Sequence, residues 1–362
     1  MREYTQEKDG TIIGDDGKIF LFSIERFKRN IVFGNCCFIC GVKITEENRS
    51  QEHVLPNWIL RKFNLHDKNI TLPNLSTFRY SQYVIPCCET CNGLMAETFE
   101  AKIAPTINGG LEKFAELVQE DGFRLIYNWM ALIFLKTHLK DAQLRENLDQ
   151  RAGDETLGKQ AYDYEALHHV HCLARSFYTE AIWDNYVNGS LYIGPAKSID
   201  GTESFDFADN FIGKTTLLRM NDICILAVFN DGGAVMQFMT PNYIEKFTNG
   251  LTPIQIREFF TRFTHCNLSI KTHPIFQSII DGENGYKIIA NVPSEIQFYE
   301  FNHVVFGELM WNYCREFITA SGKPLAETEA EIKRGIFSYI LDEKQNFNTK
   351  SMVVMKGEQG SI

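Results

Sequence analysis

The pattern of polar and apolar positions predicts a β-rich start followed by a helical centre. In residues 1–32, Asp-Gly turn signals separate short apolar runs such as Ile19-Phe20-Leu21-Phe22. Asp-Gly between apolar runs is typical of β-hairpins, so we expect a small antiparallel β lead-in. Over residues 111–148, apolar side chains recur at helical spacing, which predicts long helices with buried faces.

The remainder of the chain, residues 150–362, mixes strand-like and helical patterns. Asn230-Asp231-Gly232-Gly233 stands between two apolar runs and predicts a hairpin turn. Taken with the start of the chain, these patterns predict an α+β fold. The expected strands cover 190–193, 223–229, 234–239 and 286–292, and the expected helices cover 253–263 and 301–317.

Composition indicates a folded, soluble protein. Hydrophobic residues make up 44% and charged residues 23% of the 362 positions, which is typical of globular chains. No apolar run approaches the length of about 20 residues that a membrane span needs, and the first ten residues are polar rather than signal-like. We therefore expect a cytoplasmic protein with no membrane partner.

The charge distribution limits how nucleic acid could be bound. The net charge of −10 argues against a protein that coats nucleic acid with its whole surface. Between Glu25 and Lys68, however, eight basic residues stand against five acidic ones. This stretch could meet phosphates locally, or it could be an ordinary surface of mixed charge.

Ten cysteines fall into two groups. Four of them lie singly in apolar stretches and are expected to be core residues: Cys172, Cys224, Cys266 and Cys314. Four others form two CxxC pairs, each with an extra cysteine next to it (Cys36 and Cys87). Two such pairs predict one tetrahedral zinc, because each offers two thiolates on a single turn. The predicted structural zinc ligands are Cys37, Cys40, Cys88 and Cys91.

An acidic residue and a histidine lie between the two cysteine pairs. Glu52-His53 precedes Pro56, and the segment Pro56–Phe63 is predicted to be a short amphipathic helix with Trp58, Ile59 and Phe63 facing the core. His53 is then expected at the end of the preceding extended segment.

A second cluster of metal-ligand residue types occurs at His168, His169, His171 and Cys172. On a strand, His169 and His171 would share a face, as two ligands require. No third partner stands at a recognisable spacing, so packed or surface histidines are the preferred interpretation.

The two cysteine pairs, Glu52-His53-Val-Leu-Pro56-x-Trp58 and Cys91-Asn92 together resemble the HNH family of endonucleases, also called His-Me finger or ββα-metal nucleases. The likeness is to the zinc-stabilised branch with two CxxC pairs, and it covers residues 33–104. The resemblance implies a ββα-metal module with a structural zinc knuckle. Four segments follow from it: a β lead-in at 1–32, the HNH module at 33–104, a helical segment at 105–149 and a larger α+β domain of unknown role at 150–362.

The resemblance also implies a role for each site residue. His53 is expected to be the general base, and Glu52 and Asn92 are expected to hold one catalytic divalent cation, Mg²⁺ or Mn²⁺. A neutral imidazole can take a proton from water near pH 7, and oxygen ligands suit these hard cations. The implied reaction is hydrolysis of a DNA phosphodiester bond by the activated water.

Two positions depart from the family pattern. The acidic position is commonly Asp and is here Glu52. The middle residue, often an Asn that orients the histidine, falls on Tyr83, and Asn74 and Gln82 are other candidates for this role.

Three interpretations of function remain open from the sequence. The first is a DNA endonuclease, with bacterial restriction or anti-phage defence as a setting suggested by analogy, and a homodimer or a regulatory ATPase as possible partners. The second is a non-catalytic zinc-stabilised module that binds nucleic acid or protein. The third is an RNase, because the ββα unit grips mainly the backbone.

Overall fold

The computed structural model describes residues 3–160, 162–184, 187–199, 204–282, 285–318 and 325–349. They form a mixed α+β structure, as predicted from the sequence. The chain divides into two compact units, and each spans several segments. The first unit comprises Met1–Gly109, Lys113–Asn188 and Ile275–Asn291; the second comprises Gly110–Glu112, Gly189–Pro274 and Val292–Ile362.

The first unit begins with the predicted β lead-in. Its three short strands pair antiparallel in the order β1-β2-β3. Gly10 and Gly17, in the connecting turns, have φ of +90° and +80°, which glycine adopts without the steric cost that other residues meet. The strands are β1 (Tyr4–Gln6), β2 (Ile12–Gly14) and β3 (Ile19–Leu21), followed by α1 (Ile24–Arg26) and η1 (Phe27–Val32).

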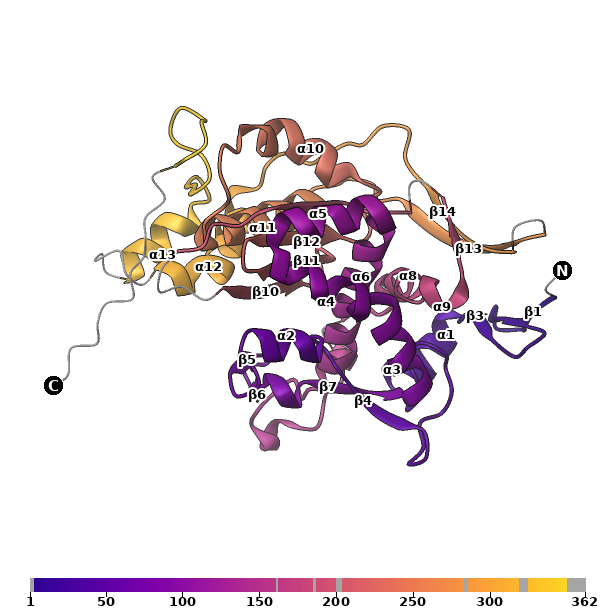
Figure 1. Ribbon diagram of the computed structural model, residues 1–362. Helices are drawn as coiled ribbons and strands as arrows, with labels where there is room; N and C mark the ends of the chain where they lie inside the picture. The colour runs from indigo at the N-terminus through magenta and orange to yellow at the C-terminus, as the bar shows by residue number, and fades with distance from the viewer. Residues whose placement is uncertain are drawn as a thin grey trace. The chain divides into compact units, whose positions relative to one another are not determined.

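The first unit also contains an antiparallel strand pair followed by a helix (Figure 1). The strands β4 (Arg49–His53) and β7 (Val84–Cys88) pair so that Arg49 lies opposite Cys88 and His53 opposite Val84. The chain leaves β7 directly into a continuous helical stretch made of α3 (Glu89–Met95), η3 (Ala96–Glu100) and α4 (Ala101–Thr106).

The connection from β4 to β7 contains the predicted short helix. It is α2 (Asn57–Lys62), and Pro56 at its N-cap sets the backbone for the first turn. Ile59 and Phe63 are buried as expected. Trp58 is only partly buried, and its ring stacks on that of Trp129 at 6.3 Å between centroids. The connection continues through β5 (Asn69–Thr71), β6 (Thr77–Arg79) and η2 (Tyr80–Gln82).

The helical pattern predicted over residues 111–148 corresponds to two helices. Gly122, with a φ of +80°, lies between them. The longer one, α6, is buried on nearly all sides, as expected for a helix that is apolar around its circumference. It packs against α8, and both lie in the first unit. The elements here are η4 (Ile107–Gly109), α5 (Gly110–Asp121), α6 (Phe123–Asp141), η5 (Gln150–Ala152), α7 (Leu157–Gln160), α8 (Glu165–Ala174) and α9 (Ser176–Thr179).

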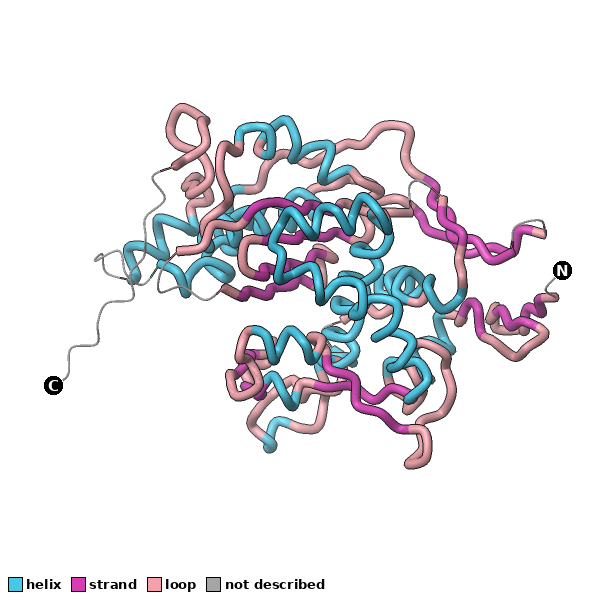
Figure 2. The backbone as a smooth tube through the Cα atoms, in the orientation of Figure 1, coloured by secondary structure: helices cyan, strands magenta, loops and turns pink. Residues whose placement is uncertain are grey.

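A late segment of the chain completes the first unit. Strands β13 (Ile275–Asp281) and β14 (Gly285–Asn291) form a long antiparallel hairpin (Figure 2), and the short β8 (Ile182–Trp183) pairs parallel with β14. The predicted strand at 286–292 is thereby confirmed.

The second unit is built on a four-stranded antiparallel sheet in the order β10-β11-β12-β9. Its two inner strands are buried at every position, and the amphipathic α11 packs against them. A capping box between Thr252 and Gln255 starts α11 next to Pro253, which explains why the sequence located this helix well. The elements are β9 (Leu191–Pro195), β10 (Phe205–Asn210), β11 (Thr215–Met220), β12 (Ile223–Val228), α10 (Ala234–Asn242), η6 (Ile244–Lys246), α11 (Pro253–Leu268), α12 (His303–Ile318) and α13 (Leu325–Lys333).

One predicted strand in the second unit is wrong. Residues 234–239 belong to the helix α10, so Asn230–Gly233 is not a hairpin turn. Asp231 explains the difference, because its carboxylate accepts a hydrogen bond from the backbone N–H of Val235 at 2.8 Å, within the first turn of the helix. Gly233, with φ of +89°, supplies the left-handed residue that redirects the chain.

Candidate metal centre and histidine site

Four cysteines converge in the first unit. The Sγ atoms of Cys37, Cys40, Cys88 and Cys91 all lie within 4.8 Å of one another. A tetrahedral zinc with Zn–S bonds of about 2.3 Å has S···S edges of about 3.8 Å. The Cys40–Cys88 separation of 3.7 Å matches this edge. The predicted four-cysteine cluster is confirmed, and its donor set fits a structural zinc.

Local backbone structure brings each cysteine pair into position. In the first pair, Gly41 adopts φ of +81° and its N–H donates to the carbonyl of Cys37 at 2.8 Å, which closes a tight knuckle. In the second pair, Cys88 is the N-cap of α3 and Cys91 lies in the first turn of that helix. The two-residue spacing therefore comes from a turn in one case and from a helix start in the other.

Contacts between the cysteine sulfurs shift their pKa values in opposite directions. Hydrogen bonds from Cys40 and Cys87 lower the pKa of Cys37, and the same contact with Cys37 raises the pKa of Cys40 to about 12. Cys87 approaches Cys37 at 3.6 Å between sulfur atoms but is not one of the four converging ligands. Zinc binding at this cluster should therefore release protons.

A buried arginine supports the first cysteine knuckle. Arg175 has no exposed surface, and its guanidinium donates to the carbonyl oxygens of Ile39, Ile19 (2.6 Å) and Phe20 (3.2 Å). No carboxylate pairs with it among the residues that the structure describes. A zinc bound by four thiolates carries two net negative charges, which this cation would partly offset. Sequence patterns did not indicate Arg175, because it lies 135 positions after Cys40.

The carboxylate of Glu52 forms a buried ion pair. Lys136, on α6, donates to Glu52 Oε1 at 2.6 Å and to the backbone carbonyl of His53 at 2.8 Å. The two residues are only 7% and 3% exposed, so water screens this pair little. Lys136 thereby fixes both the acidic residue and the main chain of the histidine. The sequence did not indicate this residue either.

His53 lies half-buried at the end of β4. Burial is the largest influence on its imidazole and lowers its pKa, and Glu52 opposes this effect. Lys136, His66 and Arg61 lower the pKa of His53 further. The imidazole is therefore neutral at pH 7 and has a lone pair to accept a proton.

Asn92 and Glu100 lie on the helical stretch after β7. The side-chain amide of Asn92 donates to Ser50 Oγ on β4 at 2.7 Å, which ties the helix to the strand that carries Glu52 and His53. Glu100, eight positions after Asn92, is partly buried. Burial raises its pKa, and it lies within electrostatic range of both Lys136 and Glu52.

The candidates for orienting His53 have other partners. The buried Tyr83 hydroxyl donates to Asp141 Oδ1 at 2.8 Å. Asn74 donates to the carbonyl of Arg145 and accepts from Ser76, and Gln82 is exposed. Tyr83 contributes through its backbone carbonyl, which accepts from Val54 N–H at 3.0 Å and extends the strand pairing beyond His53.

The histidines of the second cluster lie on the helix α8, so the arrangement considered for a strand does not occur. His168 and His171 donate to the carbonyls of Phe22 and Phe38 at 2.7 and 2.9 Å. His169 stacks on Phe276 with 3.6 Å between ring centroids. Burial lowers the pKa of all three, so they are neutral packing residues, as preferred from the sequence.

Within the described ranges, the four cysteines are the only convergent set of three or more His, Cys, Asp or Glu side chains. Glu52, His53 and Glu100 do not form a second convergent set of this kind. In the same part of the chain, no helix combines the length and apolar composition that crossing a membrane requires. No protein-family model, curated protein or solved structure matches the chain.

Proposed function

We propose that the first unit is a zinc-stabilised endonuclease of the HNH type, which hydrolyses phosphodiester bonds of DNA. The observation that supports the proposal most is the order of its parts: strand β4, its partner β7 and the helix α3 that follows without a break. His53 stands at the end of β4, and Cys88, opposite the start of β4, belongs to the cysteine cluster.

The chemistry assigned to His53 follows from its protonation state. Its neutral imidazole accepts a proton from water, and the hydroxide attacks the phosphorus. The bond between phosphorus and the 3′ oxygen breaks, and this oxygen takes a proton from solvent, which leaves a 5′ phosphate and a 3′ hydroxyl. Arg61, whose charge acts on the ring, provides positive charge for the substrate phosphate.

Glu52 and Asn92 are the residues proposed to hold the catalytic cation. A carboxylate and an amide oxygen suit Mg²⁺ or Mn²⁺, and the bound cation would neutralise charge on the phosphate. Lys136 already uses one oxygen of Glu52, so the cation has to share this carboxylate or displace the lysine. Glu100 influences this pair electrostatically but does not converge with Glu52 and His53, so it is not proposed as a ligand.

The ion pair between Lys136 and Glu52 also favours the second candidate function, a zinc-stabilised module that binds nucleic acid without cutting it. A carboxylate neutralised by a buried lysine does not need a metal ion. The two candidates differ in one measurable respect, which is whether the chain breaks phosphodiester bonds.

The test of the proposed reaction is incubation of zinc-loaded protein with supercoiled plasmid, single-stranded DNA and RNA, with Mg²⁺, with Mn²⁺ or with EDTA. We expect metal-dependent nicking of the plasmid, with ends that carry a 5′ phosphate. Cleavage of RNA alone would instead identify an RNase. Binding without cleavage of any substrate would favour the non-catalytic module.

A further inference from the structure

A cavity of 280 Å³ lies in the second unit, and none of its lining residues belongs to the proposed nuclease site. Its wall comes from α10, from α11 and from the segment that leads into α12. Half of the lining residues are aromatic: Phe238, Tyr243, Phe298, Tyr299 and Phe301. The volume is near the lower end of the range for small-molecule pockets, which suits a ligand of one or two rings.

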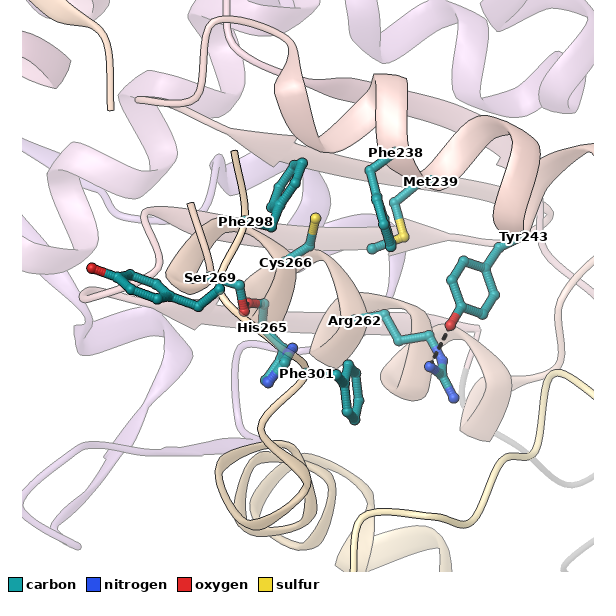
Figure 3. Close-up of a pocket in the computed structure, with 10 residues that line it drawn as sticks. Phe238, Met239, Tyr243, Arg262, His265, Cys266, Ser269, Phe298 and Phe301 are labelled. Carbon is teal, nitrogen blue, oxygen red and sulfur yellow. Dashed lines mark hydrogen bonds between the residues drawn. The ribbon is translucent and has the colours of Figure 1, made fainter. Parts of the chain in front are cut away.

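The aromatic rings stand on two sides of the cavity (Figure 3). Phe238 and Phe298 lie 5.3 Å apart between centroids, and Phe301 lies 4.5 Å from the ring of His265. Phe238 and Phe301 are 40% and 46% exposed. Rings that expose this much surface beside a buried floor offer stacking faces to a planar guest.

The charged group at the cavity is already neutralised. Arg262 is paired with the fully buried Glu258 at 2.6 Å, and it donates to the hydroxyl of Tyr243 at 2.7 Å. Glu258 is fixed in turn by Ser338 Oγ and by the N–H of Ile340. The cavity therefore offers no excess charge to an anion or a cation, and an uncharged ligand is favoured.

His265 contributes a hydrogen-bond acceptor to the wall of the cavity. His265 Nε2 lies 3.2 Å from the carbonyl of Asn302 and must therefore carry the proton of the neutral ring. Burial lowers the pKa of His265 and keeps the ring neutral. Its Nδ1 is then an acceptor, and this atom has no hydrogen-bond partner in the described parts of the chain. Burial raises the pKa of Cys266, so the thiol in the floor is not a nucleophile.

We propose that this cavity binds a small, uncharged, planar heteroaromatic molecule, which stacks on the exposed rings and donates one N–H to His265 Nδ1. This inference is independent of the proposed nuclease function. An aromatic side chain of another protein would use the same rings, but a volume for one or two rings that aromatic side chains border on two sides favours a free molecule.

The experiment is ligand-observed NMR saturation transfer on the full chain, with indole and purine as probes. Both carry an N–H donor. 1-Methylindole has the same ring system without the donor, and cyclohexanol is a non-aromatic control. We expect indole to bind with a dissociation constant on the order of 1 mM or below. We expect 1-methylindole to bind about tenfold more weakly, because it leaves the His265 acceptor unpaired.

Two variants test the assignment of the site. Phe301→Ala removes a stacking face and should weaken indole binding about fivefold or more. Phe337→Ala is the matched control, because this side chain is 43% exposed and does not line the cavity. His265→Phe keeps a ring but removes the acceptor, so indole and 1-methylindole should then bind equally. The proposal is overturned if neither indole nor purine gives a saturation-transfer signal at a concentration about tenfold above the expected dissociation constant. It is also overturned if Phe301→Ala and Phe337→Ala bind indole with the same affinity.

Discussion

Lys136 contacts both Glu52 and His53 at the proposed nuclease site, and the sequence did not indicate it. It brings a buried positive charge between the carboxylate of Glu52 and the main chain of His53. A sequence cannot indicate such a partner, because 84 positions separate Lys136 from Glu52 and no local spacing links the two residues. The cysteine ligands could be predicted because each pair is local, and a spacing of two residues already fixes its geometry.

The ion pair itself can be tested by its effect on stability. Lys136→Met leaves an unpaired buried carboxylate, so we expect it to lower the free energy of unfolding by about 3–5 kcal/mol. Adding Glu52→Gln to the Lys136→Met variant removes the unpaired negative charge. The double variant should therefore recover part of the lost free energy of unfolding. Urea denaturation of the two single variants and the double variant measures the coupling.

An exposed lysine provides the control for this cycle. Lys102 pairs with Asp121 at 2.6 Å, but its side chain is 46% exposed. Lys102→Met should cost less than about 1 kcal/mol. Equal losses for the two lysine variants would contradict a special role for Lys136.

Elements with a local sequence signal were predicted correctly. The element that was not predicted has a cap that depends on the tertiary fold. The helix α11 begins with a capping box and a proline, and the sequence located it within a few residues. The helix α10 was expected to be a strand, because its apolar run is short and periodicity alone does not separate the two. The buried carboxylate of Asp231, which caps α10, decides the outcome, and its burial depends on the tertiary fold.

We expect the protein to lose stability in acid because of a histidine on the helix α8, His169. Burial lowers the pKa of His169 from 6.5 to about 3, with a further contribution from His168. Because the folded pKa is below the unfolded one, this histidine contributes stability above pH 6.5, and the contribution is lost as the pH falls toward 3. Between pH 7 and pH 5, His169 should account for about 1–2 kcal/mol of the decrease.

His169→Phe tests this expectation, because it keeps a ring to stack on Phe276 and removes the titrating group. Unfolding by urea at pH 7 and at pH 5 should show a smaller decrease for the variant than for the natural chain. An identical decrease in both proteins would mean that His169 does not control the acid sensitivity.

For the whole molecule, we expect metal removal to destabilise one of the two compact units more than the other. The cysteine cluster joins residues 37–40 to residues 88–91, and both segments belong to the first unit. Structural zinc contributes directly to folding energy. Removing it should therefore weaken the strands and helix that the cluster joins before it affects the sheet of the second unit.

Hydrogen–deuterium exchange with mass spectrometry measures this response. After treatment with a zinc chelator, peptides from β4, β7 and α3 should exchange faster, whereas peptides from β11 and β12 should keep their protection. Equal acceleration in both sets of peptides would show that the two units do not respond separately. No acceleration in either set would contradict a structural metal at the four cysteines.

The most direct test of the proposed nuclease is the rate of plasmid nicking by His53→Ala. Loss of a general base typically lowers the rate by about 100-fold or more, so we expect at least this decrease with Mg²⁺ or Mn²⁺ present. His303→Ala, an exposed histidine of the second unit, is the matched control and should cleave at the natural rate. Zinc content and circular dichroism should be unchanged in both variants. Nicking by His53→Ala at the natural rate would contradict the assignment of His53 as the catalytic base.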